Sequence, residues 1–382
     1  MFYFYILLTG FKKNCDGVSR NDIYLYSAFI LLFVIQLVGV SYSENKGDAL
    51  IYVQKNIVFL LLPIAFINYS KIINFQSLKN SVYGLLLGVI VILLSIYINI
   101  LSIIFENNMP IKALLFQFVR VDFVKYGIVE IHPPYFGVLV VFCIVILLYN
   151  NFFKNKLLDF IIRSFLFLFF IFSLYGISSF MSILLLGFLL LFHLFYLVKN
   201  RKIKILMFLF LVGSMFVISK IDFRGVTKQF PGGSLLGRIE WSIYKGKGDT
   251  SRPENWNSVL SVVKEHPFFG IGSDGGLNEL QKHRTEISES FKNKHNAHNQ
   301  YLEILLRHGI LGLILYLFIL AELFRVSIRT NNKIFVWFLL TFTLASITES
   351  YLVRQIGLTF FTFFALLFYT LYYPINYKEN SL

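Results

Sequence analysis

Long apolar stretches, separated by short polar segments, follow one another along most of this chain. A helix needs about 20 apolar residues to cross a hydrocarbon core about 30 Å thick. The pattern therefore predicts ten membrane-spanning helices, at residues 23–41, 56–69, 81–105, 133–149, 157–174, 178–198, 204–220, 303–325, 333–349 and 356–373. Residues 1–10 are apolar but have only about half that length, and they lack the basic leader and cleavage site of a secretory signal. We expect them to form a truncated or tilted first helix.

One hydrophilic segment, residues 221–302, interrupts this pattern between two predicted spans. It contains eleven lysines and arginines, nine acidic residues and four of the seven histidines. Segments of this length are usually functional or disordered, and its tryptophans and the Phe268–Phe269 pair argue against disorder. Apolar positions within residues 254–267 predict an amphipathic helix, on the membrane surface or on the bundle, that Pro267 ends. We expect an all-α fold: a single membrane domain, residues 1–382, with about 10–12 transmembrane helices and one large, mostly helical extracytoplasmic loop.

Basic residues predict the orientation, because short loops rich in lysine and arginine stay in the cytoplasm. Fifteen of them fall in the loops and tail on one side of the spans, against six in the short loops on the other side. The richer side comprises residues 11–22, 70–80, 150–156, 199–204 and 325–333 and the C-terminal tail. Segment 221–302 then faces the periplasm or exterior of a multi-pass protein in the bacterial inner membrane.

Composition agrees with a membrane protein and excludes a soluble domain. Hydrophobic residues make up 57% of the chain and charged residues 15%, outside the usual range of soluble domains. The formal charge of +14 is mostly explained by the cytoplasmic anchors. No basic stripe alternates with aromatic residues on a soluble domain, so nucleic acid is not an expected partner. Cys15 and Cys143, in a loop and in a span, are not expected to form a disulfide.

Two motif-like features of the long segment have ordinary explanations. GIGSDG, residues 270–275, matches G-x-G-x-x-G, but no βαβ unit surrounds it, so a tight turn is predicted. His295 and His298 are spaced to share a helix face and could contact zinc, yet a zinc site needs at least a third ligand. The H-E-x-x-H pattern is absent. We predict no metal site.

Charged and polar side chains gather where the pattern predicts the outer membrane face. Arg238 and Arg252 lie in the long segment, and a planar guanidinium suits phosphate oxygens; pairing with nearby acidic residues is the alternative. Glu349 and Arg354, in ITESYLVRQIG, and His132, in IHPPY, lie at the predicted outer ends of spans. Ionisable residues in such places are costly and tend to be functional.

Four segments, in order, resemble the membrane-embedded O-antigen ligase and O-antigen polymerase superfamily. They are SRPENW (251–256), KEHPFFGIGSD (264–274), HNQYLEILLRHGILGL (298–313) and TESYLVRQIG (348–357). Each is weak alone, but their order on a polytopic chain with one large outer loop is specific. The region of resemblance covers about residues 160–350.

The resemblance implies a metal-independent, lipid-carrier-dependent glycosyltransferase without a cofactor. Such an enzyme moves a glycan from undecaprenyl diphosphate to an acceptor hydroxyl, on lipid A core or on another glycan, at the outer face of the inner membrane. The chain contains no Asp-x-Asp pair of the kind that soluble transferases use to hold a divalent ion. The partners that the resemblance implies are the lipid-linked glycan donor, the acceptor and membrane lipid.

The residues take the following roles under this resemblance. His298 is the catalytic base, with Glu303 or Glu349 as the carboxylate that orients it. Arg252 and Arg238 stabilise the charge that grows on the departing diphosphate. The supporting polar residues are Asn299, His132, Glu349 and Arg354.

One departure from the superfamily and several rival functions stay open. Many relatives carry an arginine beside a serine early in a middle span, where this chain reads YGISSFMS (175–182), and Arg238 or Arg224 could replace it. Ligase and polymerase share donor and mechanism, so a repeat-unit polymerase of O-antigen, capsule or exopolysaccharide is the alternative, and transfer to protein hydroxyls is a third. A lipid-linked-oligosaccharide transporter is less favoured, because no internal repeat is visible. A non-catalytic scaffold is the residual interpretation.

Overall fold

The computed structural model describes residues 23–116, 118, 121–200, 202, 251–286 and 288–379. Every regular element within those residues is a helix, which confirms the predicted all-α membrane bundle. In this described part of the chain, seven helices or helix pairs are long and apolar enough to cross a membrane, and two more apolar helices, Pro133–Tyr149 and Lys333–Ala345, are shorter. The predictions for residues 1–10, for a span at 204–220, and for Arg224 and Arg238 lie outside the described residues.

The chain divides into two compact units, residues 1–84 with 251–382 and residues 85–250. The helices of the first unit are α2 (Ile23–Tyr42), α3 (Lys46–Lys55), α4 (Val58–Tyr69), α13 (Ser251–Glu265), α14 (Leu277–Lys282), α15 (Glu289–Lys292), α16 (Gln300–Arg329), α17 (Lys333–Ala345), η3 (Tyr351–Val353) and α18 (Gln355–Glu379). The second contains α6 (Ala113–Phe116), α7 (Val121–Val124), α8 (Pro133–Tyr149), α9 (Lys156–Ile177) and α10 (Phe180–Leu197). Helix α5 (Phe75–Glu106) begins in the first unit and ends in the second.

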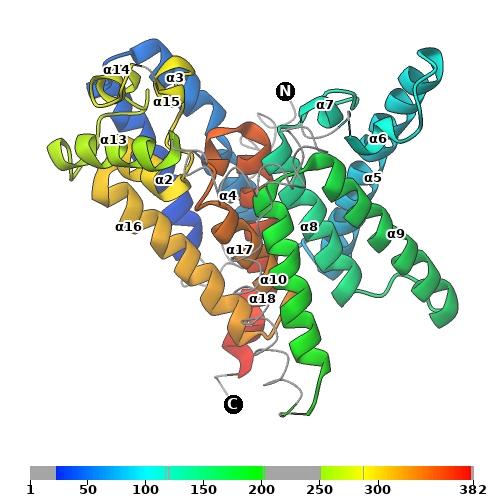
Figure 1. Cartoon of the computed structure of the whole chain (residues 1–382). Coiled ribbons are helices and arrows are strands. Elements are labelled where there is room, and N and C mark those ends of the chain that lie inside the picture. Colours follow the sequence, from blue (N-terminus) through cyan, green and yellow to red (C-terminus); the bar gives the residue numbers. More distant parts are fainter. Residues whose placement is uncertain are drawn as a thin grey trace. The chain divides into compact units, whose positions relative to one another are not determined.

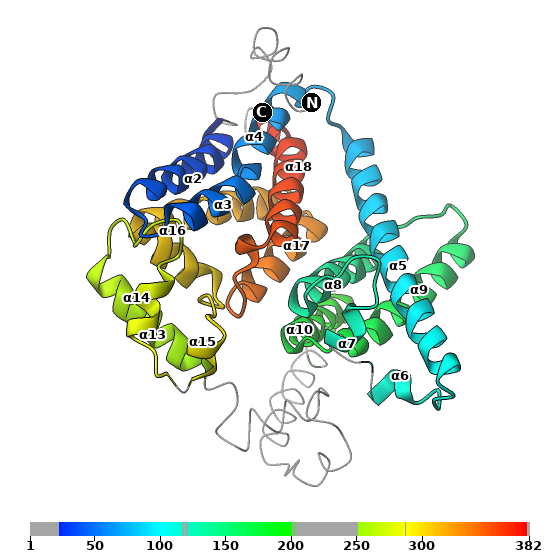
Figure 2. The same ribbon diagram turned by 90° about the horizontal axis from the view of Figure 1, so that it is seen from above.

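Aromatic side chains form the core of the first unit, between its membrane helices. Helix α16 packs against α2, α17 and α18, and α4 lies against α2 and α18 (Figures 1 and 2). The ring of Phe361 on α18 stacks on Phe342 of α17, with centroids 4.2 Å apart, and also contacts Phe338 and Phe29. These stacked rings bury large apolar areas and fix the distance between the helices.

The loop segment, which we define as residues 251–286 and 288–299, folds as three short helices at the N-terminal end of α16. Helices α13, α14 and α15 gather there, with α13 in contact with α14, α15 and α16 (Figure 1). A small core of Val259, Val262, Leu280, Ala297 and Leu306 holds α13 and α14 against α16. The predicted amphipathic helix at 254–267 is therefore α13, and it buries its apolar face on the bundle.

The second unit is built around α8, whose side chains are buried along nearly its whole length because α9 and α10 flank it. Pro133 and Pro134 occupy the first turn of α8, where a missing N–H costs nothing. His132 precedes them at the N-cap position. The YGISSFMS stretch forms the turn between α9 and α10, with Ser178 in the left-handed region at a φ of 49°.

Candidate functional site

The first turns of α16 are interrupted by a break at Gly309, which has a φ of 62° and a ψ of −163°. In an unbroken helix the N–H groups of Ile310 and Leu311 would donate to the carbonyls of Leu306 and Arg307. They donate instead to the carbonyls of Pro267 and Phe268, at 2.9 and 3.5 Å. A side chain at Gly309 would collide with the backbone of Phe268. The break thus lets the loop segment reach the helix backbone.

The glycine turn, residues 270–275, donates hydrogen bonds to the two helix carbonyls that the break leaves free. The N–H groups of Ile271 and Gly272 donate to the freed carbonyls of Leu306 and Arg307, at 2.9 and 3.0 Å. Two missing helical hydrogen bonds are replaced by four bonds to the loop segment. Gly272 has a positive φ of 105°, which a residue with a side chain would adopt only with strain. The prediction of a tight turn at residues 270–275 is confirmed.

The same turn is tied to the end of α2. The hydroxyl of Tyr42 donates to the carbonyl of Phe269 at 2.8 Å, and the hydroxyl of Ser273 donates to the carbonyl of Gln36 at 2.5 Å. The carboxylate of Asp274 accepts the backbone N–H of Asn45 at 2.9 Å. The turn is therefore fixed by both α2 and α16.

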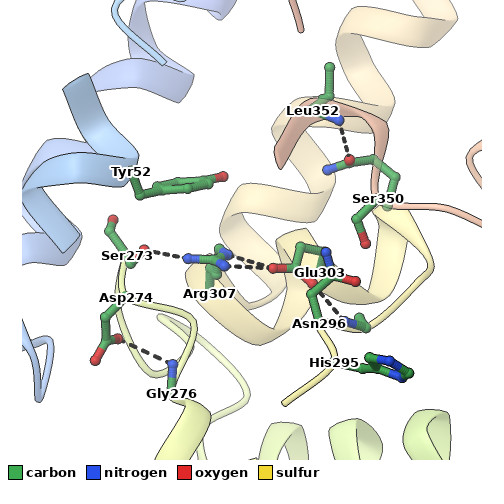
Figure 3. Close-up of polar contacts among 12 residues, drawn as sticks. Tyr52, Ser273, Asp274, Gly276, His295, Asn296, Glu303, Arg307, Ser350 and Leu352 are labelled. Carbon is green, nitrogen blue, oxygen red and sulfur yellow. Dashed lines mark hydrogen bonds and ion pairs between the residues drawn. The ribbon is translucent and has the colours of Figure 1, made fainter. Parts of the chain in front are cut away.

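A buried ion pair lies beside the turn (Figure 3). Glu303 and Arg307 are one helical turn apart on α16, and the Nε and Nη2 of Arg307 both lie 2.7 Å from Oε1 of Glu303. The Nη1 of Arg307 donates to the carbonyl of Ser273, and the guanidinium lies 4.2 Å from the ring centre of Tyr52. Each charge therefore has a partner, as burial requires.

Side chains from several elements fix the backbone of residues 295–299. Arg284 donates to the carbonyl of His295 at 2.7 Å, and Trp256 donates to the carbonyl of Ala297 at 3.0 Å. The N–H of Ala297 donates to Oε2 of Glu303 at 2.9 Å. Burial lowers the pKa of the Arg284 guanidinium, but an arginine keeps its charge at neutral pH. The stretch that carries His298 is thus held from both sides.

His298 lies against a carboxylate from a distant part of the sequence. Its Nδ1 is 2.9 Å from both carboxylate oxygens of Glu349, and 26% of the His298 side chain is exposed against 7% for Glu349. An ionised carboxylate only accepts hydrogen bonds, so it favours the tautomer with the proton on Nδ1. The lone pair of Nε2 is then available to accept a proton, which is the arrangement of a general base held by a carboxylate.

Comparison with known proteins shows which family this chain resembles. Residues 165–317 match the family model described as O-antigen ligase. An uncharacterized protein of Haemophilus influenzae is 22% identical over 342 residues, 87% of this chain and 73% of that protein. An O-antigen ligase of Pseudomonas aeruginosa is 31% identical over 102 residues, 26% of this chain and 24% of the ligase. The resemblance to the O-antigen ligase superfamily is confirmed. It supports a ligase-like membrane enzyme of polysaccharide biosynthesis.

The ligase-family match contains His298 and Glu303, whereas Glu349 follows it in the sequence. Of the two carboxylates predicted to orient His298, the structure brings Glu349 to the imidazole. Glu303, the other predicted carboxylate, is used differently: its oxygens accept hydrogen bonds from Arg307 and from the N–H of Ala297. A carboxylate held in this way supports the backbone before His298.

The other residues predicted for the candidate site are placed as follows. Asn299 caps α16, with its side-chain oxygen accepting the N–H groups of Tyr301 and Leu302 at 3.0 and 3.1 Å. Arg252 is on the first turn of α13 and half-buried, and Arg354 is exposed between η3 and α18. His132 belongs to the other compact unit.

Sequence reasoning gave no role to Arg307 and Arg284, which lie in this candidate site. Arg307 had a visible signal, because a glutamate and an arginine four residues apart near the start of an apolar span are expected to pair. Arg284 had none. It lies in a polar stretch of the sequence, and only the folded loop segment shows that its guanidinium is buried among backbone carbonyls.

Proposed function

We propose that the protein is a metal-independent glycosyltransferase that moves a glycan from undecaprenyl diphosphate to an acceptor hydroxyl, on lipid A core or a similar acceptor. The reaction would take place in the bacterial inner membrane, with the loop segment facing the periplasm. The observation that carries the proposal is the contact of His298 with Glu349, in a chain whose residues 165–317 match the O-antigen ligase family.

The proposed step needs a base and a stabilised leaving group. The acceptor oxygen attacks the anomeric carbon of the donor sugar, and the bond from that carbon to the diphosphate oxygen breaks. Nε2 of His298 takes the proton of the acceptor hydroxyl, and Glu349 stabilises the imidazolium that forms. Base catalysis of this kind contributes about 10²- to 10⁴-fold. The diphosphate leaves with both electrons of the broken bond.

Among the residues that the structure describes, Arg252 is the one proposed to bind the departing diphosphate. A guanidinium keeps its charge and offers a planar set of donors to phosphate oxygens. Arg252 is on the first turn of α13, and Trp256 on the next turn donates to the carbonyl of Ala297, directly before His298. Arg238 stays a second candidate for the same role. Because Arg252 is partly exposed, a ligand can reach it without unfolding the loop segment.

A deletion strain complemented with His298→Ala tests the base. We expect the variant to accumulate in the membrane but to lose polysaccharide attachment. His283→Ala is the matched control, because His283 also faces a glutamate in the loop segment, with its Nε2 3.5 Å from Oε1 of Glu265. Wild-type polysaccharide from the His298→Ala strain would show that the imidazole is not the base.

The lipid-linked glycan that accumulates separates the two candidate acceptors. Long unattached chains on the lipid carrier are expected for a ligase, since polymerisation still proceeds. Single repeat units are expected for the alternative, an O-antigen, capsule or exopolysaccharide polymerase, whose acceptor is another repeat unit. Loss of lipid-linked glycan from the outer face altogether would instead support a transporter.

A further inference from the structure

We propose that Glu303 and Arg307 are positioning residues that hold the backbone of His298 in place for the reaction. The inference rests on the proposed function for its kinetic readout. It assigns these two residues no contact with substrate. Their effect passes through the N–H of Ala297, the residue directly before His298.

The two oxygens of Glu303 have separate partners. Oε1 receives Nε and Nη2 of Arg307, while Oε2 receives the N–H of Ala297 at 2.9 Å. The Glu303 side chain is 1% exposed. Its carboxylate therefore joins the start of α16 to the backbone that precedes His298, without access to solvent.

Arg307 in turn is fixed by elements that lie far away in the sequence. Its guanidinium donates to the carbonyl of Ser273 in the glycine turn and lies over the ring of Tyr52 on α3 (Figure 3). The turn also passes so close at Gly275 that a Cβ there would meet the guanidinium. The position of Glu303, and through it of Ala297, is thus set by α3, α16 and the turn together.

Stability alone does not account for such a pair. A buried ion pair is often no more stabilising than well-packed apolar residues of similar volume, because both charges lose their hydration. What the pair adds is direction, since a carboxylate locked by Arg307 can accept the Ala297 N–H in one geometry. His298 has a φ of 45° in the left-handed region, a conformation that persists only when its surroundings hold it.

Two double variants isolate the bond to Ala297 without leaving a buried charge alone. Arg307→Met with Glu303→Gln keeps a side-chain oxygen for the Ala297 N–H, and Arg307→Met with Glu303→Leu removes it. Both pairs are neutral and similar in volume. With lipid-linked glycan isolated from the deletion strain, we expect kcat of the leucine variant to be about tenfold or more below that of the glutamine variant, with KM unchanged.

A second readout does not depend on activity. Diethylpyrocarbonate labels accessible imidazoles, and mass spectrometry gives the rate at each histidine. We expect His298 to be labelled faster in the leucine variant than in the glutamine variant, because its backbone and its contact with Glu349 loosen. His283, which is in the loop segment but outside these contacts, is the internal reference.

Arg325→Met is the matched control. Arg325 pairs with Glu322 near the other end of α16, so its loss tests a missing ion pair on the same helix. We expect kcat to stay within about twofold of wild type, since a partly exposed pair contributes little. If the leucine variant does not accumulate, the glutamine variant is compared with wild type, and equal kcat and equal His298 labelling in those two proteins would overturn the inference, because Arg307 would then not be needed to hold Glu303.

Equal kcat and equal His298 labelling in the two double variants would also overturn it, because α13 and Arg284 would then hold the backbone alone. Failure of the proposed function looks different. In that case His298→Ala keeps full turnover. The labelling of His298 in the two double variants, which both keep the histidine, still reports whether Glu303 positions it.

Discussion

At the residue scale, the His298 and Glu349 contact combines two features that favour a chemical role over a packing role. The imidazole is partly exposed while the carboxylate beneath it is nearly buried, so one ring nitrogen is held and the other can meet a ligand. The left-handed backbone of His298 is strained for a residue other than glycine. Strain of this kind is concentrated at functional sites, and the surrounding hydrogen bonds maintain it.

Glu349→Gln is expected to lower kcat by about 10²-fold or more, because an amide can donate to Nδ1 as well as accept from it and so no longer fixes one tautomer. The rate of glycan transfer by the purified protein measures the effect. Glu279→Gln is the control, since Glu279 pairs with Lys282 on the surface of α14. Equal rates for the two variants would show that Glu349 does not act on His298.

The sequence suggested His298 with Glu303 or Glu349 as its orienting carboxylate, but it could not choose between the two. Glu303 is five residues from His298 and Glu349 is fifty-one, so separation along the chain does not show which carboxylate contacts the ring. The fold brings Glu349 to the ring although it is the more distant in sequence. Asn299, the residue after His298, donates its backbone N–H to the hydroxyl of Ser350, the residue after Glu349, at 3.2 Å. Gln300 joins the same two segments, because its backbone N–H donates to the carbonyl of Ser346 at 2.8 Å and its side-chain oxygen accepts the N–H of Leu352 at 2.7 Å.

At the element scale, the boundaries of α2 and α8 agree with the hydropathy pattern to within one residue, because in a membrane apolar length decides where a helix runs. Helices α16 and α18 extend several residues beyond the predicted spans. The break in α16 did not follow from the hydropathy pattern. Gly309 lies in HGILGL, and glycines inside spanning helices are common, so the sequence gives no sign that this one takes a left-handed φ. The reason is tertiary: the loop segment replaces the helical hydrogen bonds there.

Gly309→Ala is expected to destabilise the fold strongly. The left-handed backbone alone costs a residue with a side chain about 1 to 3 kcal/mol, and the new Cβ would lie 2.3 Å from the carbonyl of Phe268. Thermal unfolding in detergent should show a clear fall in Tm and weaker binding of the loop segment to α16, seen as faster hydrogen exchange of the Ile271 and Gly272 amides.

Gly88→Ala is the control for that variant. Gly88 is inside α5, and a Cβ there would meet nothing within 4 Å. Alanine is a better helix former than glycine by about 1 kcal/mol, so Tm should hold or rise slightly. A Tm for Gly309→Ala equal to that of Gly88→Ala would mean that the break in α16 does not depend on glycine.

At the scale of the whole molecule, the all-α membrane bundle was predictable because the apolar stretches and the basic loops repeat along the chain. The division into two compact units was not, since hydropathy describes each helix by itself. Within the first unit the contacts agree with one shared end for the predicted outer segments: Asn45 contacts Asp274 and Asn299 contacts Ser350. The orientation of that end in the membrane stays a prediction.

Single cysteines at two exposed positions test this orientation, in a background of Cys15→Ser and Cys143→Ala. Asn293→Cys lies in the loop segment, and Lys154→Cys lies in the basic connection between α8 and α9. An impermeant maleimide added to intact spheroplasts should label Asn293→Cys and should reach Lys154→Cys only after permeabilisation. This is the expected result because short basic loops stay in the cytoplasm. The reverse labelling pattern would place the loop segment, and His298 with it, on the cytoplasmic side, away from an outer acceptor. The proposed transfer at the outer face would then be impossible, whatever the chemistry of the His298 and Glu349 pair.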